Sequence, residues 1–331
     1  MAKDMEMSKM DVRNLSSEEM VYEPVGSNRI SDIDDLCSRW QCGCKNNIVR
    51  NVSDTIKFYK EIVNKNPCGP FETDFFCVAA RKKYMTEEQK RTVRLGDTCM
   101  LNKVILKRFD IPKFLSKLNQ ADACVPYYLD RGNNQIPSSC FVFYMNLNHT
   151  DVFKAMHEFR HLLADWDYDL NTLLEFSNDN KRDNLGNQIK SIKDNLMKSF
   201  QNPKNMNKRW FDIDCDFVIT QDSERVLDAI MHIKKVLCDV TESEVYAIVT
   251  QGGVHYVVLS DALSEYNTRL ALKIQNRCEI KDKVLTPASL KKLIIRECLN
   301  KHIEIKEIDI NQNSMVPMPG TMQNGHLVYL A

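Results

Sequence analysis

The sequence predicts an α/β protein of the α+β type, in which a mixed, largely antiparallel sheet carries flanking helices. Three observations favour this class. Residues 209–217 alternate aromatic or branched apolar side chains with acids, which is typical of a half-buried strand. Residues 223–238 carry apolar side chains at helical spacing. Two short apolar runs, 245–249 and 256–259, flank a Gly-Gly turn, which is the pattern of an antiparallel hairpin.

The composition indicates a globular protein of one large domain or two ordinary ones. The chain has 331 residues, of which 43% are hydrophobic, and its formal net charge is +0. A neutral chain has no general attraction for nucleic acid, so any such binding must rest on local patches. No apolar run is long enough to cross a bilayer, and residues 1–10 lack an apolar signal core, so we expect no membrane partner and no secretion. The 12 scattered cysteines favour free thiols in a reducing compartment, the cytoplasm or the nucleus.

The chain divides into three regions by composition. Residues 1–30 are polar and lack periodicity, which predicts a flexible N-terminal tail. Residues 31–135 should form a mainly helical or irregular region, with a helix over 52–63 and a strand-like run at 75–80. Residues 136–331 contain the alternating strands and helices, and we expect the functional domain there.

The densest basic cluster follows the strand-like run of the middle region. Glu87 and Glu88 interrupt it, and a solvated helix face is the frequent outcome for such a pattern. If the cluster is functional, it would hold phosphates of a nucleic acid. Its members are Arg81, Lys82, Lys83, Lys90, Arg91 and Arg94.

A possible zinc motif lies in the helix expected at 151–165, which follows a strand at 139–148. His157-Glu158-Phe159-Arg160-His161 matches the His-Glu-x-x-His pattern of zinc proteases. However, Arg160 puts a cation between the two ligands, and no third ligand stands in a recognisable context. The spacing of Cys37, Cys42 and Cys44 also fits no standard zinc motif. We therefore prefer an amphipathic helix and unliganded cysteines, and do not expect zinc.

The acids of the predicted strand 209–217 form the strongest candidate site. Asp212, Asp214 and Asp216 are two residues apart, so in an extended chain they point to the same side. Such a row of carboxylates repels itself and resists burial unless cations lie against it. Hard oxygen ligands suit Mg²⁺ or Mn²⁺ better than zinc. The alternative is a half-exposed edge strand whose acids face water.

Three further features surround this strand in the sequence. Lys208 and Arg209 precede it and offer cations for phosphates. The turn Thr250-Gln251-Gly252-Gly253-Val254-His255 has two glycines that a phosphate can approach, although a simple hairpin with a hydrogen-bonded histidine is the default. A helix at 285–300 and a strand at 302–310 then bring a further acid, Asp309.

The order of these motifs resembles the archaeo-eukaryotic primase superfamily, which includes primase-polymerases, small primase catalytic subunits and phage- or virus-encoded members. The likeness covers roughly residues 140–331. Many relatives carry an arginine two residues before the proline of the last turn, where this chain has Pro317. The motifs that carry the resemblance are Phe211-Asp212-Ile213-Asp214, Thr250-Gln251-Gly252-Gly253-Val254-His255, and Asp309 with Pro319-Gly320-Thr321.

The resemblance implies a DNA primase or primase-polymerase with an RRM-like catalytic core at 136–331. It implies template-directed nucleotidyl transfer, with nucleoside triphosphates and single-stranded DNA as partners and two Mg²⁺ or Mn²⁺ ions as cofactors. A separate replicative helicase is expected because no P-loop pattern is present. The implied metal ligands are Asp212, Asp214 and Asp309 with Asp216 in reserve, and the implied nucleotide contacts are His255, Gly252, Gly253, Thr250, Lys208 and Arg209.

Two other functions remain open at this point. An inactive primase-like protein that binds single-stranded DNA would use the cluster Arg81 to Arg94 without catalysis. A zinc metallohydrolase would use His157, Glu158 and His161.

Overall fold

The structure is a computed structural model that describes most of the chain. The described residues are 47–65, 68–106, 110–175, 192–207, 209–218, 223–260, 287–311 and 315–331. They all belong to one compact unit, Gly43–Ala331. The expected tail at 1–30, the cysteines at 37, 42 and 44, and Lys208 lie outside the described residues.

The α+β class and the largely antiparallel pairing are confirmed. Two five-stranded antiparallel sheets lie in the described part of the unit Gly43–Ala331, and we call them the first and the second sheet. The first sheet has the order β2 (Thr98–Leu106), β1 (Glu72–Arg81), β3 (Phe141–Asn146) and β9 (Met315–Pro317), with β4 (Thr150–Asp151) also paired to β1. The second has the order β12 (Tyr329–Leu330), β6 (Val245–Val249), β7 (Gly253–Leu259), β5 (Trp210–Phe217) and β8 (Ile305–Asn311).

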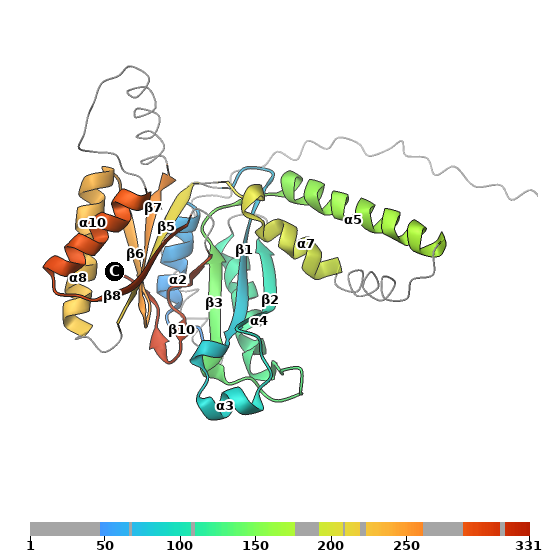
Figure 1. Ribbon diagram of the computed structural model, residues 1–331, viewed down its shortest axis with the longest axis horizontal. Helices are drawn as coiled ribbons and strands as arrows, with labels where there is room; N and C mark the ends of the chain where they lie inside the picture. The colour runs from blue at the N-terminus through green and yellow to red at the C-terminus, as the bar shows by residue number, and fades with distance from the viewer. Residues whose placement is uncertain are drawn as a thin grey trace, which may run out of the picture. The chain divides into compact units, whose positions relative to one another are not determined.

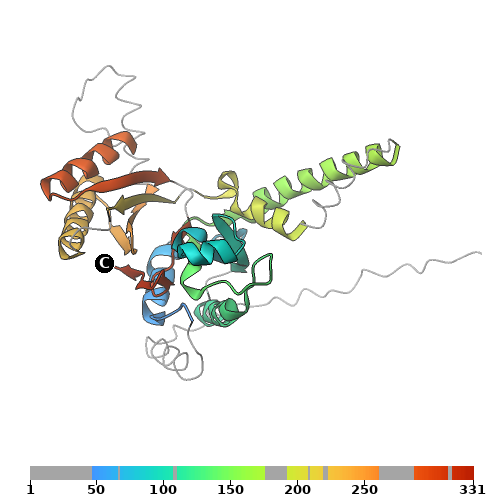
Figure 2. The same cartoon turned by 60° about the horizontal axis from the view of Figure 1, so that its bottom comes forward.

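Helices α8 (Ser223–Thr241) and α10 (Pro287–Asn300) cover one face of the second sheet (Figures 1 and 2). Their apolar stripes pack with the odd-numbered side chains of β5, so that Ile213 and Cys215 are fully buried in the same core. This packing explains the alternation of apolar and acidic residues in 209–217, because only one face of the strand meets helices. The acids of β5 therefore occupy the other face.

The remaining helices flank the first sheet or connect the two sheets. Helix α5 runs to Glu175, further than the predicted end at residue 165, and packs beside α7 (Figure 1). These elements are α2 (Val52–Phe58), which continues as the π-helix η1 (Tyr59–Val63), α3 (Glu87–Thr92), α4 (Ile111–Cys124), α5 (Val152–Glu175) and α7 (Ile192–Gln201). Short 3₁₀ turns occur at η2 (Lys82–Tyr84), η3 (Val125–Tyr127), η4 (Ser138–Cys140) and η5 (Pro203–Asn205), and β10 (Met322–Gln323) pairs with β11 (His326–Leu327).

The described part of the region expected to be mainly helical or irregular, 31–135, is mostly so, but it also holds two long strands. It contains the long strands β1 and β2, and β1 pairs with β3 in an antiparallel ladder, Phe76 opposite Met145. The first sheet therefore uses residues from both sides of the expected boundary at 135. The physical reason is that the uninterrupted apolar run of β1, buried from Thr73 to Ala80, needs neighbours on both edges.

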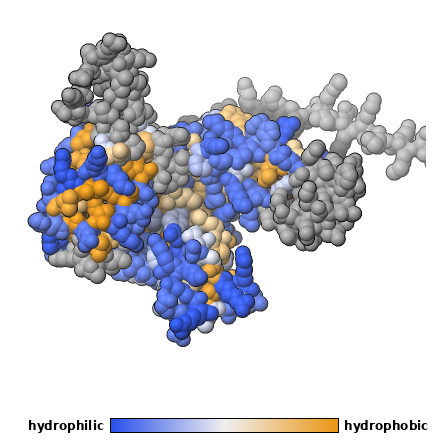
Figure 3. All heavy atoms as spheres, in the orientation of Figure 1, coloured by the Kyte–Doolittle hydropathy of each residue, from blue (hydrophilic) through white to orange (hydrophobic). Residues whose placement is uncertain are grey.

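The surface shows where this fold leaves apolar groups uncovered. Hydrophobic residues gather over α8 and α10 in Figure 3, and the exposed apolar side chains of these helices include Leu227, Met231 and Leu299. Among the described residues, no helix combines the length and the apolar content needed to cross a membrane.

Candidate functional site

The candidate site is a row of side chains across three neighbouring strands of the second sheet. Strand β5 lies between β7 and β8, and both pairings are antiparallel. Asp214 on β5 stands directly opposite His255 on β7 and Asp309 on β8. Residues that face each other across a sheet point to the same side. Three residues far apart in the sequence, Asp214, His255 and Asp309, thus lie together, and we call them the acidic row.

Two further acids of β5 extend the acidic row along the strand. Asp212 lies two residues before Asp214 on β5, and its side chain is only 2% exposed. Asp216, on the other side, faces Glu307 and Gly253. Asp214 is 40% exposed at its side chain and Asp309 is exposed. The carboxylates therefore range from buried to open along one face, with water access at the Asp309 end.

His255 is tied to the carboxylates on either side of it. Its Nδ1 lies 3.1 Å from both carboxylate oxygens of Asp212, and its Nε2 lies 3.6 Å from Oδ1 of Asp214. Burial by itself would lower the pKa of His255, but the charge and hydrogen bonding of Asp212, with Asp214 and Asp216 behind, raise it to about 9. The imidazole is therefore a cation at neutral pH.

The pKa of Asp214 is also raised, which for a carboxyl group favours the uncharged form. Burial raises its pKa to about 6, and Asp212, Asp216 and Asp309 reinforce the rise while His255 acts against it. A divalent cation would relieve this crowding, and the donor set is made of hard carboxylate oxygens, which fits Mg²⁺ or Mn²⁺. The side chains as they stand do not form a closed cage. Among the described residues, the acids of β5 and β8 are not a group of three whose ligand atoms all lie within 4.8 Å of one another.

The two glycines of the Gly-Gly turn have different structural roles. Strand β7 already begins at Gly253, so His255 lies inside the strand and the turn is shorter than the predicted 250–255. Thr250 closes the turn by donating its backbone N–H and its hydroxyl to the carbonyl of Gly253. A Cβ at Gly253 would lie 2.0 Å from the carbonyl oxygen of Cys215, whereas one at Gly252 would lie 3.7 Å from Oδ1 of Asp216. Gly253 allows β5 and β7 to approach, and Gly252 borders the acidic face.

The basic cluster at 81–94 separates into two parts. Lys83 lies in η2, directly after β1. Partial burial and the neighbouring Arg81 lower its pKa, and the charges of Asp216 and Asp214 act against this lowering. The Nη1 atom of Arg81 donates to the Tyr144 hydroxyl over 2.6 Å. Its Nε atom is buried and has no hydrogen-bond partner among the described residues.

The second part of the cluster belongs to α3 and the residues after it. Lys90 donates to Glu87 over 2.7 Å on the same helix, while Arg91 and Arg94 are exposed. This part is a solvated helix face, the outcome that Glu87 and Glu88 favour in the sequence. Lys82 is partly buried in the 3₁₀ turn between the two parts.

The structure does not bring Arg209 to the acidic row. Its guanidinium donates to Glu72 on β1 over 3.0 Å, and its backbone N–H donates to Asn148 over 2.8 Å. The predicted nucleotide contact of Arg209 stays a prediction, because the ion pair with Glu72 does not test it. The residue precedes β5, and its side chain pairs with the first sheet because Glu72 offers a carboxylate with a side chain only 15% exposed.

The described part of the possible protease motif on α5 consists of two facing histidines and a glutamate that hydrogen-bonds elsewhere. The Nε2 atoms of His157 and His161 lie 3.0 Å apart, as expected one turn apart on a helix. Glu158, which would be the general base, instead accepts hydrogen bonds from Asn202 and Asn205. The part of the chain that the structure describes places no third ligand group with these two histidines.

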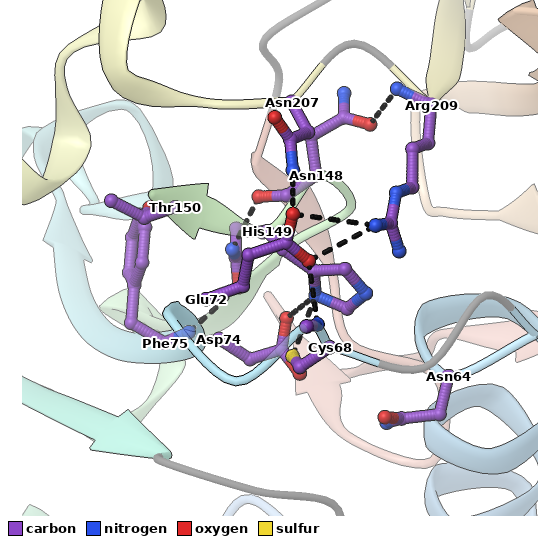
Figure 4. Close-up of polar contacts among 12 residues, drawn as sticks. Asn64, Cys68, Glu72, Asp74, Phe75, Asn148, His149, Thr150, Asn207 and Arg209 are labelled. Carbon is purple, nitrogen blue, oxygen red and sulfur yellow. Dashed lines mark hydrogen bonds and ion pairs between the residues drawn. The ribbon is translucent and has the colours of Figure 1, made fainter. Parts of the chain in front are cut away.

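Sequence reasoning missed one cluster, formed by Cys68, Asp74 and His149 (Figure 4). The ligand atoms of these three residues all lie within 4.8 Å of one another, and no other group of three among the described residues does so. Nothing in the sequence singles them out, because each stands alone in its segment. Only the pairing of Thr73 with Thr150, which sets β4 beside β1, brings Asp74 and His149 together.

A cavity of about 500 Å³ borders the Gly-Gly turn on the side of α8. Its lining includes Gly252, Val226, Leu227 and Phe217, and is therefore mostly apolar. It lies against the helix-covered face and is separate from the acidic row.

Comparisons with known proteins add no relative. No family model, no curated protein and no solved structure matches the chain.

Proposed function

We propose that the protein is a metal-dependent nucleotidyltransferase that makes or extends primers on single-stranded DNA, as a DNA primase or primase-polymerase. One observation carries the proposal, namely the register that sets Asp214 between Asp309 and His255 on adjacent strands. This is the convergence of carboxylates and histidine that the primase motifs in the sequence imply. Two Mg²⁺ or Mn²⁺ ions bound there would activate a 3′-hydroxyl and neutralise the leaving pyrophosphate.

The acidic row supplies the ligands for such ions in this proposal. Asp214 and Asp309 present carboxylates from two strands, and Asp212 holds a third that is almost fully buried. A buried carboxylate keeps one orientation, while the exposed Asp309 leaves room for substrate at the other end. Asp216 lies beside Gly252 and serves as a reserve ligand.

Cations next to the acidic row would bind the triphosphate. His255 lies beside Asp214, with its Nε2 3.6 Å from Oδ1 of that residue, and would offer a ring N–H to a phosphate oxygen. Lys83, which is exposed in the 3₁₀ turn after β1, adds a positive group. A polyanion that bridges these groups would meet both the carboxylate-bound metals and the cations, which is the arrangement phosphoryl transfer needs.

The cellular setting follows from thiol chemistry. The cysteines that the structure describes are free, which is typical of a reducing compartment. We therefore place the activity in the cytoplasm or nucleus, with a separate helicase opening the template.

The test is nucleotide incorporation on single-stranded DNA with labelled ribo- or deoxynucleotides and Mg²⁺ or Mn²⁺, with the products resolved by size. Wild-type protein should form dinucleotides and longer primers, and Asp214→Asn should reduce them to background while keeping its circular dichroism spectrum. Asp239→Asn removes one exposed charge from α8 and is the matched control. Full incorporation by a folded Asp214→Asn protein would refute the proposal.

The same assay separates the binding-module alternative. Wild-type protein that binds single-stranded DNA equally well in chelator, and incorporates no nucleotide with either metal, would be a non-catalytic replication factor. In that case the acidic row would be a structural feature only.

A further inference from the structure

The cluster of Cys68, Asp74 and His149 has the geometry of a metal site. The Sγ atom of Cys68 lies 3.1 Å from Nδ1 of His149 and 3.4 Å from Oδ2 of Asp74. The same Nδ1 of His149 contacts Oδ1 of Asp74. A sulfur, a nitrogen and an oxygen thus converge on one point (Figure 4). Ligands about 2.0–2.3 Å from a common zinc ion would lie about 3.3–3.6 Å apart, so the two sulfur contacts come near this spacing, and Asp74 and His149 would have to separate to admit the ion.

A catalytic triad would look different. In a triad, the acid holds one ring nitrogen of the histidine and the nucleophile contacts the other. Here both Cys68 and Asp74 contact the same nitrogen of His149. The arrangement therefore suits three ligands around a shared cation better than a proton relay between an acid and a thiol.

Burial makes an ion at this point favourable. The side chains of Asp74 and His149 are each 1% exposed, and Cys68 is partly buried. A carboxylate this deep is costly to fold unless a cation or strong hydrogen bonds compensate it. The fold prepares the site from three segments: Cys68 precedes β1, Asp74 lies in β1, and His149 precedes β4.

The cluster is surrounded by a second layer of hydrogen bonds. Glu72 lies two residues before Asp74 and accepts from the backbone N–H of Gly69 over 2.9 Å. It also accepts from Arg209 and from Asn207. These bonds hold the backbone next to Cys68 and the residues before β5 against β1, but they do not contact the three cluster side chains.

Residues next to the cluster also hold the start of β5 by hydrogen bonds. Asn207 donates its backbone N–H to the carbonyl of His149 over 2.9 Å. The side chain of Asn148 accepts from the backbone N–H groups of Arg209 and Trp210 and donates to the carbonyl of Trp210 over 3.0 Å. Asp212 stands two residues further along β5. The cluster therefore fixes the point where the first sheet passes into the strand of the acidic row.

We propose that Cys68, Asp74 and His149 bind a zinc-class divalent cation that anchors the entry to strand β5. The mixed sulfur, nitrogen and oxygen donors favour zinc over Mg²⁺, and three protein ligands leave a fourth position for water or another donor. This site is separate from the acidic row, and its existence does not depend on the proposed activity. It also reverses the expectation that the protein does without zinc, which was based on the motifs at 37–44 and 157–161.

The test is metal analysis of the full-length chain purified without chelator. Wild type should contain about one zinc per chain, and His149→Ala or Cys68→Ser should lose it. Cys99→Ser, which changes another partly buried free cysteine, should keep it. Unchanged zinc content in both Cys68→Ser and His149→Ala would overturn the proposal.

Cobalt substitution tests the site by absorption spectroscopy of the wild-type protein, so the result does not depend on whether a variant folds. Wild-type protein reconstituted with Co²⁺ should show a thiolate-to-cobalt charge-transfer band and the visible bands of a tetrahedral site. Absence of the thiolate band in wild type would overturn the assignment of Cys68. A variant with serine at positions 37, 42 and 44 should retain both zinc and the cobalt spectrum. Loss of both from that variant, with retention in Cys68→Ser, would assign the metal elsewhere and refute the site.

Discussion

The two glycines of the β6–β7 turn should respond very differently to the addition of one methyl group. At Gly253 the new Cβ would lie 2.0 Å from the carbonyl oxygen of Cys215 and 3.0 Å from Cα of Asp216. These are backbone atoms of β5, so they cannot move aside as a side chain would. At Gly252 the nearest atom is Oδ1 of Asp216 at 3.7 Å, which is an ordinary contact.

The size of the effect follows from these distances. To bring the contact at Gly253 from 2.0 Å to an ordinary 3.4 Å, β7 must move away from β5 by about an ångström or more. Overpacking of this kind costs about 1–3 kcal/mol or more in unfolding free energy. The displaced pair, Asp216 with Gly253, lies two residues along the strands from the pair of Asp214 with His255. The acidic row should therefore shift as well. Gly252→Ala should change stability by no more than about 1 kcal/mol, because neither its space nor its backbone φ is restrictive.

Urea unfolding of wild type, Gly252→Ala and Gly253→Ala measures the difference. We expect a clear fall in the unfolding midpoint for Gly253→Ala alone. Under the proposed function, Gly252→Ala should keep its midpoint but raise the KM for nucleotide, since the methyl group borders the acidic face. Equal stability of Gly253→Ala and wild type would show that the close approach of β5 and β7 is wrong.

Three further predictions concern other parts of the molecule. Asp122→Ala should lower the unfolding free energy by about 3 kcal/mol or more, because this buried carboxylate accepts three backbone N–H groups from residues 47–49. Asp110→Ala, which loses one exposed helix-capping bond, should cost only about 1 kcal/mol. In chelator, stability should fall as pH rises from about 6.5 through 9, by on the order of 3 kcal/mol, because the raised pKa of His255 stabilises the folded state only while the imidazole is protonated. At pH 6, Mn²⁺ binding should release a fraction of a proton, because Asp214 with a pKa of about 6 is partly protonated before the metal arrives.

Each of these predictions has a result that would contradict it. Similar unfolding midpoints for Asp122→Ala and Asp110→Ala would mean that residues 47–49 find other acceptors. For the pH series, the raised pKa of Asp214 adds no slope above about pH 6, so His255→Gln should flatten the profile. An unchanged slope in that variant would exclude His255 as its source. Calorimetry in buffers of different ionisation enthalpy counts the protons released, and none at pH 6 would contradict the perturbation of Asp214.

The local pattern of the sequence was enough to predict the second sheet. The alternation in β5 indicates one face packed on helices and one face without them, so the placement of Asp212 and Asp214 together on the face without helices could be derived. The spacing of apolar residues in α8 likewise predicted which face of this helix is buried, and Ile230 and Ile233 lie on that face. Patterns of this kind work where one face is buried and the other is not.

Pairing between distant segments was beyond such reasoning. The opposition of Asp214 and Asp309 depends on β8 returning beside β5, which no local pattern states and only the resemblance suggested. The cluster of Cys68 and His149 depends on a two-residue strand, β4, finding the edge of β1. Arg209 looked like a phosphate ligand by its position, but the partner that engages it, Glu72, stands 137 residues earlier. Long-range register decided each of these outcomes.

Manganese binding by the acidic row tests the account most directly. Electron paramagnetic resonance of free Mn²⁺ during titration should show weaker binding by Asp214→Asn and by Asp309→Asn than by wild type and the control Asp239→Asn. Nucleotide incorporation should be lost in parallel in the two row variants. If Asp309→Asn binds Mn²⁺ and incorporates nucleotides as wild type does, strands β5 and β8 do not share a catalytic metal site, and the proposed function fails.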